Sequence, residues 1–325
     1  MRPFDLIRPE SLDEALKALA LPGARAVAGG TNLVDLMKLS VEAPAALVDI
    51  RRLPLHEISL GADTVVMGAL VANSAAAADP AIVLQAPAIS EALLSGASGQ
   101  IRNAATLGGN LLQRTRCGYF RAADWACGKR EPGSGCAAAT GINAGHAVLG
   151  TSPHCMAVHP SDLAVALLAL DATVHLRSRD GARRIPLGDF YRLPADTPHI
   201  ETALASGELV TAIEVPLTAP AKTSRYLKLR GRASYEFATA SVAAAVLVEH
   251  GVVAEVAIAL GGVGTVPWRD RAAEAQLVGR PLSAPSIEAF CDALLAGAVT
   301  TPANAYKLPL LRGAIHRALE RSATS

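Results

Sequence analysis

Apolar residues recur with helical spacing in some segments and as short continuous runs in others, and the first 50 residues show both patterns. A helix through Leu19 follows a capping box at Ser11 to Glu14. Buried strands are predicted over 25–28 and 46–50, with residues 33–37 at helical spacing between them. Strand, Gly-rich turn, helix and strand in this order predict a right-handed parallel βαβ unit.

The same patterns divide the rest of the chain into two parts. A stretch rich in Pro, Ala and polar residues at 216–223 indicates a domain boundary. Before it, strands are predicted over 64–68, 172–176 and 209–215. Helices are predicted after a cap at Asn73-Ser74 and over 86–94 and 163–170. After it, strands are predicted over 225–230, 241–249 and 252–260, with a hairpin at His250-Gly251, and helices over 268–278, 284–296 and 303–321. Strands followed by helices are typical of an α+β domain.

Residues 112–158 show neither the helical nor the strand periodicity of apolar residues. A loop of that length in a compact protein is uncommon unless it is functional or held by something else. It contains four of the five cysteines, with the spacing C-x9-C-x8-C-x18-C (Cys117, Cys127, Cys136 and Cys155). The fifth, Cys291, falls on the apolar stripe of a predicted helix and is expected in the core.

These four cysteines could form disulfides, bind zinc or hold an iron–sulfur cluster. Disulfides are disfavoured because no apolar signal region follows Met1, so secretion by a signal of its own is not expected. Structural zinc sites usually take ligands in close pairs such as CxxC, and none occurs here. Wide spacing suits a four-iron cluster, whose irons need thiolates from different directions. The spacing alone favours an iron–sulfur cluster only modestly over a zinc site.

Composition narrows the function. With 325 residues and 51% hydrophobic content, the chain can bury a sizeable core in two domains or a little more. The net charge is +1 and no basic block stands out, which argues against a nucleic-acid partner. No apolar run approaches the ~20 residues that span a bilayer. We therefore expect no membrane span.

Two Gly-Gly segments carry candidate binding chemistry. Gly29-Gly30-Thr31-Asn32 follows a predicted strand and opens a helix, and Thr106 to Asn110 contains a second Gly-Gly turn at Gly108-Gly109. Glycines let backbone amides approach an anion closely. Each turn alone is weak evidence, but two of them suit the two ends or two phosphates of a large dinucleotide. Asp162 either caps the following helix or accepts a hydrogen bond from a ligand hydroxyl.

Together these residues resemble the flavin-binding subunits of the molybdenum hydroxylases, the family that includes xanthine dehydrogenase, carbon monoxide dehydrogenase and aldehyde oxidoreductase. The resemblance covers the whole chain. It implies an α+β fold with an FAD-binding PCMH-type domain of two α/β subdomains over 1–218, a loop insertion at about 112–158, and a CO dehydrogenase flavoprotein-like C-terminal domain with an antiparallel sheet and helices over 222–325. The FAD contacts it implies are Arg25, Ala26, Val27, Ala28, Gly29, Gly30, Thr31, Asn32 and Leu33 in the first loop, Thr106, Gly108, Gly109 and Asn110 in the second, and Asp162, Val210 and Lys228.

The segment with the four cysteines, residues 112–158, most resembles the corresponding part of the FAD subunit of the periplasmic aldehyde oxidoreductases. Residues 113–117 (QRTRC) and 132–136 (PGSGC) have near-identical counterparts there. That subunit carries a [4Fe–4S] cluster beside FAD, which implies Cys117, Cys127, Cys136 and Cys155 as cluster ligands in this chain. With this resemblance, an iron–sulfur cluster is strongly favoured over a zinc site. Arg114, Arg116, Arg121, Lys129 and Arg130 would then either surround the cluster, favouring its reduced state, or form a charged surface.

The implied role is electron transfer within a heterotrimer. A large subunit with a molybdenum cofactor would oxidise the aldehyde, a small subunit would carry two [2Fe–2S] clusters, and this chain would pass electrons from its flavin to an external acceptor, without oxidising aldehyde alone. Two alternatives stay open: a flavin subunit of a related hydroxylase or of a 4-hydroxybenzoyl-CoA-reductase-like enzyme, and a zinc-stabilised FAD-binding assembly subunit. The compartment is expected to be the periplasm, by co-export with a signal-bearing partner, or the cytoplasm.

Overall fold

The computed structural model describes residues 1–323. Its N-terminal unit is a small parallel sheet with strand order β1-β3-β2, and the predicted βαβ unit is confirmed. The elements are β1 (Asp5–Ile7), α1 (Leu12–Leu19), β2 (Ala24–Val27), α2 (Leu33–Lys38) and β3 (Ala46–Asp49). Ser11 caps α1 by accepting from the Glu14 amide. Strand β1 escaped prediction because it has three residues, two of them exposed.

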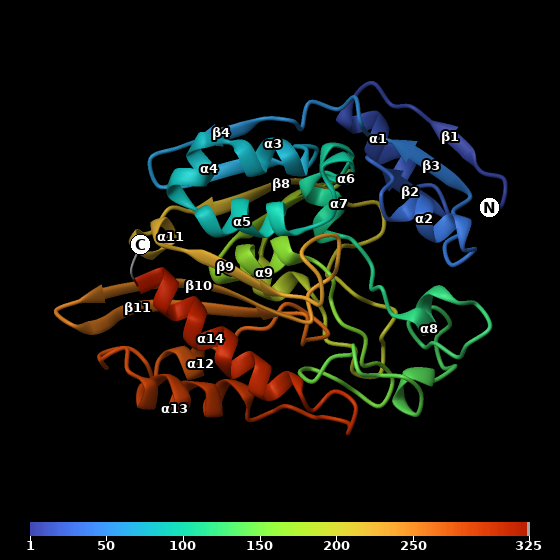
Figure 1. Cartoon of the computed structure of the whole chain (residues 1–325). Helices are drawn as coiled ribbons and strands as arrows, with labels where there is room; N and C mark the ends of the chain where they lie inside the picture. Colours follow the sequence, from blue (N-terminus) through green and yellow to red (C-terminus); the bar gives the residue numbers. More distant parts are fainter. Residues whose placement is uncertain (324–325) are drawn as a thin grey trace.

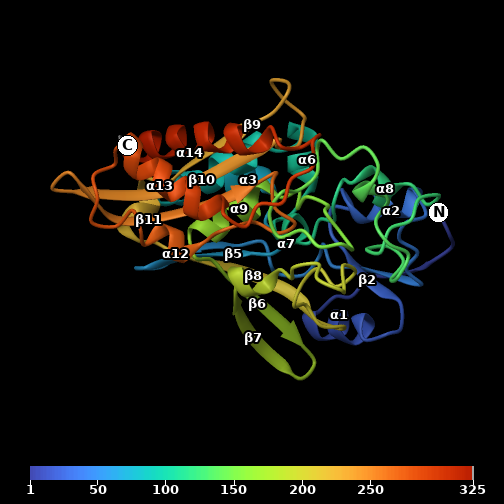
Figure 2. The ribbon, with the colours of Figure 1, turned by 90° about the horizontal axis from the view of Figure 1, so that it is seen from below.

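The second unit is a five-stranded antiparallel sheet with strand order β4-β5-β8-β6-β7. Its strands are β4 (Ile58–Leu60), β5 (Thr64–Gly68), β6 (Thr173–Ser178), β7 (Gly181–Pro186) and β8 (Leu209–Pro216). The helices of this unit are α3 (Asn73–Ala78), α4 (Pro80–Gln85), α5 (Pro87–Ser95), α6 (Gly99–Ala104), α7 (Leu107–Leu111), α9 (Asp162–Ala169) and α10 (Leu187–Phe190). Figure 2 shows β6 and β7 projecting from the rest of the molecule.

The C-terminal part is a three-stranded antiparallel sheet with strand order β11-β10-β9. Its strands are β9 (Arg225–Leu229), β10 (Ala240–Glu249) and β11 (Val252–Gly261), and its helices are α11 (Ala219–Lys222), α12 (Arg271–Glu274), α13 (Ala284–Leu295) and α14 (Lys307–Ala323). The sheet lies between α5 and α9 on one side and α12 to α14 on the other (Figure 1). The predicted α+β class with an antiparallel C-terminal sheet is therefore confirmed.

Strand β10 joins the two parts because successive side chains of a strand point to opposite faces. Val242, Ala244 and Val246 pack into the core with α13 and α14. Ala243 and Ala245 pack into the core of the second unit, with α5 and α9. The chain thus has a sequence boundary near residue 220, but the two cores meet across one sheet.

Several local predictions were wrong. The predicted helix over 268–278 is confined to α12, because Trp268 exchanges two backbone hydrogen bonds with Leu260 and is extended there. The predicted turn at Gly108-Gly109 lies inside α7. Asn73 does not cap α3 with its side chain, since the helix begins at Asn73 itself. Within the described chain, no helix has the length and apolar content needed to cross a membrane.

Residues 112–158 form an irregular segment beside α2, with only α8 (Gly118–Arg121) and the 3-10 turn η1 (Ala137–Ala139) as regular structure (Figure 1). The absence of periodicity in the sequence is matched by this structure. We call residues 112–158 the cysteine segment below.

Candidate functional site

The first Gly-Gly turn directly follows β2. Gly30 has φ +69°, a conformation that favours glycine. A Cβ on Gly29 would lie 1.8 Å from the Ala104 carbonyl oxygen, so this turn closely approaches the end of α6. Within residues 1–323, the amides of Gly29 and Gly30 donate to no protein acceptor, and Asn32 Nδ2 is buried without a partner. The turn therefore has unused hydrogen-bond donors of the kind that bind an anion.

The second Gly-Gly segment differs because its amides already have acceptors. Gly108 N–H donates to the Ala69 carbonyl (2.9 Å) and Gly109 N–H to Thr106 Oγ1 (3.3 Å). Asn110 Oδ1 accepts from Ser161 Oγ at 2.7 Å, and Ser161 caps α9. The segment is thus linked to α9 by side chains, and its glycine amides are less available to a ligand than those of the first turn.

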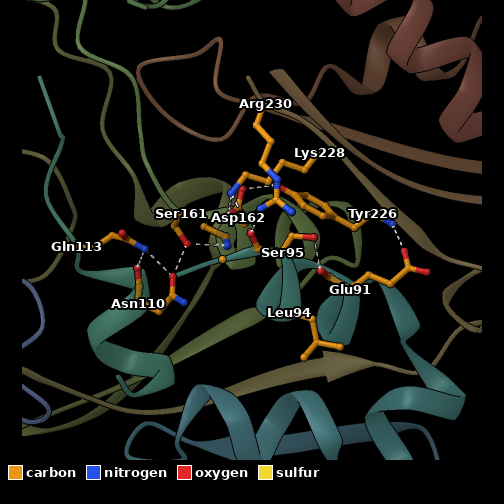
Figure 3. Close-up of polar contacts among 12 residues, drawn as sticks. Glu91, Leu94, Ser95, Asn110, Gln113, Ser161, Asp162, Tyr226, Lys228 and Arg230 are labelled. Carbon is orange, nitrogen blue, oxygen red and sulfur yellow. Dashed lines mark hydrogen bonds and ion pairs between the residues drawn. The ribbon is translucent and has the colours of Figure 1, made fainter. Parts of the chain in front are cut away.

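Asp162 begins α9 and accepts from two side chains of β9 (Figure 3). Tyr226 donates its hydroxyl to Oδ1 at 2.6 Å, and Lys228 Nζ donates to Oδ2 at 2.8 Å. Lys228 also donates to the Ser95 carbonyl, as does Arg230. Burial first, and then the Asp162 charge, raise the pKa of Tyr226 well above its usual value, so the phenol stays protonated and is a hydrogen-bond donor. Asp162 is therefore not the helix cap but the acceptor at a junction between the two parts of the chain.

A cavity of about 610 Å³ opens at this junction, within the size range of small-molecule and cofactor sites. Its walls come from three places: the cysteine segment, residues 158–162, and the C-terminal sheet with the turn after it. The lining residues include Cys117, His146, Asp162 and Gly262. His159, also in the wall, has its pKa lowered to about 3 by burial, so its ring is neutral. The cavity is mainly apolar with a few polar groups.

All four cysteines of the cysteine segment line one smaller cavity next to the first. They are free thiols: Cys127 and Cys155 are buried, and Cys117 and Cys136 are half-buried. Burial raises the pKa of Cys117, and raises that of Cys155 to about 11. Cys117 lines both cavities, so this residue lies in the wall between them. Among residues 1–323, no three His, Cys, Asp or Glu side chains are grouped so as to hold a single metal ion.

Apolar contacts and charged side chains together anchor the cysteine segment: Phe120 packs with Leu36 of α2, and Val148 and Leu149 pack in the C-terminal core. Arg114 pairs with Glu42, which follows α2, and donates to Glu201 Oε1 at 2.7 Å. Lys129 pairs with the other oxygen of Glu201 at 3.3 Å. Burial acts to raise the pKa of Glu201, but the charges of Lys129 and Arg114 outweigh it and lower that pKa. The Arg114 guanidinium also lies 4.6 Å from the ring centroid of Phe120.

The other basic residues of the segment are also engaged. Arg116 and Arg121 both bind Asp35 of α2, at 3.1 and 2.7 Å. Arg130 donates to backbone carbonyls of the segment itself, those of Tyr119, Phe120, Ala122, Ala123 and Trp125. Each of these charges has a structural partner within the chain, which fixes its position.

Comparison with known proteins decides the family. Residues 2–218 match the family model "FAD binding domain in molybdopterin dehydrogenase", and residues 225–322 match "CO dehydrogenase flavoprotein C-terminal domain". The chain belongs to the FAD-binding subunits of the molybdenum hydroxylases. It is therefore an FAD-binding oxidoreductase subunit.

Individual relatives agree with this family. The aldehyde oxidoreductase FAD-binding subunit PaoB of Escherichia coli (strain K12) is 47% identical over 302 residues, covering 92% of each chain. The carbon monoxide dehydrogenase medium chain of Afipia carboxidovorans is 27% identical over 98% of this chain and 96% of its own. Among solved structures, a reconstituted CO dehydrogenase from Oligotropha carboxidovorans has a similar chain, with TM-score 0.77, 25% identity and coverage of 99% and 98%.

In this FAD subunit, the structure brings some of the predicted FAD contacts together and leaves others apart. The first turn lies against α6, and the second Gly-Gly segment is linked to Ser161 and thus to the large cavity. Asp162 and Lys228, far apart in sequence, are in direct contact. Val210 is 2% exposed in β8 and packs in the core, and it does not line the large cavity.

Sequence reasoning missed Tyr226, His146 and Lys307. Tyr226 occurs two residues before Lys228 on the same strand, a spacing that places both side chains on one face. His146 stands alone between glycine and alanine in the unpatterned segment, so no period singled it out. Lys307 falls within the helix predicted over 303–321, where no pattern marked it as buried.

Lys307 is in fact fully buried at the edge of the large cavity. Its Nζ donates to the carbonyls of Gly262 (2.7 Å) and Gly145 (3.1 Å), and both glycines line that cavity. Loss of hydration lowers the pKa of Lys307 to about 8. Within the described residues, no carboxylate pairs with it.

The close approach at Gly29 gives a first prediction. Gly29→Ala should push the first turn away from α6, because the new Cβ would overlap the Ala104 carbonyl oxygen. We expect a lower flavin-to-protein ratio and a lower Tm. Gly99→Ala is the control, since a Cβ at Gly99 has open space around it. Full flavin and an unchanged Tm in Gly29→Ala would show that the turn is not constrained in this way.

Lys307 gives a prediction about pH. Its folded pKa of about 8 lies below the usual 10.5, so between these values the unfolded chain binds more protons and stability rises with pH. Relative to Lys307→Met, the wild-type free energy of unfolding should rise from pH 7 to pH 10, by at most about 3 kcal/mol. Urea unfolding at both values measures it, with exposed Lys222→Met as the control. A wild-type advantage that is constant or falls with pH would contradict the assignment.

Proposed function

We propose that this chain is the FAD- and [4Fe–4S]-binding electron-transfer subunit of a molybdenum-dependent aldehyde oxidoreductase complex. A large molybdenum subunit would oxidise the aldehyde, and a small subunit with two [2Fe–2S] clusters would deliver electrons here for transfer to an external acceptor. The observation that carries the proposal is the shared wall at Cys117, where the four-cysteine cavity meets the large cavity. The 47% identity to an aldehyde oxidoreductase subunit supports the choice of substrate class.

The cysteine cavity suits a cluster by its donor set. Four free thiols converge on one space from different parts of the segment. Cys127 and Cys136 are opposed across a short antiparallel bridge, and Cys155 follows a separate turn. Thiolates arriving from separate directions are what a cuboidal cluster requires. The segment builds little apolar core of its own, so metal–thiolate bonds would add to the salt bridges that hold it.

The large cavity and the two Gly-Gly segments suit FAD. The free amides of Gly29 and Gly30 would bind the pyrophosphate, because they approach without a Cβ and have no protein acceptor. Tyr226 and Lys228 fix the Asp162 carboxylate, which keeps lone pairs for a ligand hydroxyl. The apolar walls would exclude water from the ring system.

When bound, the cluster and the flavin supply the redox chemistry. The protein's part is to position them and to exclude water between them. Cys117 would be both a cluster ligand and part of the flavin wall, so the two cofactors would be neighbours. The ion pairs of Arg114 with Glu42 and Glu201 would keep the cysteine segment against the FAD-binding units, and so keep that separation short.

The cluster is tested by cysteine replacement in the full-length chain. Cys136→Ser should lose most of the iron, which we expect at about four per chain in the wild type, and should keep much of the flavin. The same variant should lose broad absorbance near ~400 nm. Iron, acid-labile sulfide and flavin assays measure these.

The matched control is Cys291→Ala. Cys291 is fully buried on α13 in the C-terminal core and does not line the cysteine cavity, so we expect no role in ligation. This variant should keep its iron. Stoichiometric zinc in the wild type, or iron lost from Cys291→Ala but not from Cys136→Ser, would reject the cluster.

A further inference from the structure

One side chain contacts the cysteine that lines both cavities. His146 Nε2 lies 3.2 Å from Cys117 Sγ. The ring of His146 lines the large cavity, and its Nδ1 is buried without a partner in the described chain. The Tyr119 ring lies beside it, with centroids 6.2 Å apart. His146 therefore stands where the cysteine cavity meets the proposed flavin pocket.

The backbone around His146 is fixed by buried bonds. The His146 amide donates to the Asn143 carbonyl at 2.9 Å. The preceding carbonyl, that of Gly145, accepts from the buried Lys307. Asn143 is buried as well, and its Nδ2 donates to the Ala138 carbonyl. The backbone that carries the imidazole is thus fixed by Lys307 of α14 and by bonds within the cysteine segment.

Chemistry sets the direction of the His146–Cys117 contact. A free thiol and an imidazole can each act as donor. A cysteine that binds iron is a thiolate and has no proton, so only the ring N–H can donate. The roles of the two ring nitrogens depend on the tautomer, and a neutral imidazole with its proton on Nε2 supplies that donor.

We propose that His146 is a positioning residue for the cluster ligand Cys117, donating an Nε2–H···Sγ hydrogen bond that raises the reduction potential of the cluster beside the flavin pocket. The inference rests on the proposed [4Fe–4S] cluster. Reduction adds negative charge that is shared with the ligand sulfurs, so a hydrogen bond to a sulfur stabilises the reduced state more than the oxidised one. Cys117 receives it on the side that faces the flavin pocket.

The proposal differs from two other uses of a Cys–His pair. If His146 were itself a cluster ligand, replacing it would remove iron. If the pair were a nucleophile and its base, Cys117 would have a lowered pKa. Cys117 instead shares one cavity with three other cysteines, an arrangement that fits a cluster ligand.

The test is a set of variants in the full-length chain. His146→Leu removes the donor, and His146→Gln keeps an N–H at a similar reach. His199→Gln is the control, because His199 is exposed and contacts no cysteine. Each protein is assayed for iron and flavin, and its cluster is titrated by potential with EPR detection of the reduced state.

We expect His146→Leu to keep its iron and flavin while its cluster midpoint moves to a lower potential. His146→Gln should restore most of the shift, and His199→Gln should match the wild type. An unchanged midpoint in His146→Leu, or loss of iron from both His146 variants while His199→Gln keeps it, would overturn the inference. Absence of iron from the wild type would instead reject the proposed cluster, so the two failures are distinguishable.

Discussion

Arg114 lies between two carboxylates that come from different parts of the chain, Glu42 after α2 and Glu201 before β8. The cysteine segment has too little regular structure to build its own core, so its position depends on such contacts. A partly buried ion pair adds little net stability, because desolvation offsets much of the attraction, but breaking it leaves an unpaired charge. Its main effect here is geometric: it helps to fix where the four cysteines lie relative to the two Gly-Gly segments.

A second junction sets the other wall of the site. Asp162 at the start of α9 binds Tyr226 and Lys228 of β9, so the first and the C-terminal parts of the chain meet at a polar contact. Strand β10 joins the same parts through alternating apolar side chains. Because the large cavity takes walls from both parts and from the cysteine segment, its shape depends on all three being assembled. A cofactor bound there would in turn link them.

The sequence predicted those features whose signal is local. The continuous apolar run of β10 and the turn at His250-Gly251 sufficed for the C-terminal hairpin. Prediction from the sequence failed where contacts with distant residues determine the local structure. Trp268 lies in an apolar stretch but pairs with Leu260, and Arg114 binds partners 72 and 87 residues away. The cysteines suggested metal binding by spacing, yet spacing alone could not show that Cys117 would also line the large cavity. The family resemblance supplied the expected FAD contacts, and the structure added Tyr226, His146 and Lys307.

The central claim is that the cysteine segment folds around an iron–sulfur cluster next to the flavin. The most direct measurement is anomalous diffraction from crystals of the full chain, recorded above and below the iron edge and the zinc edge. The account predicts iron signal in the cavity between Cys117, Cys127, Cys136 and Cys155, with flavin density on the other side of Cys117. A signal at the zinc edge alone, or cysteines joined as disulfides around an empty cavity, would contradict it.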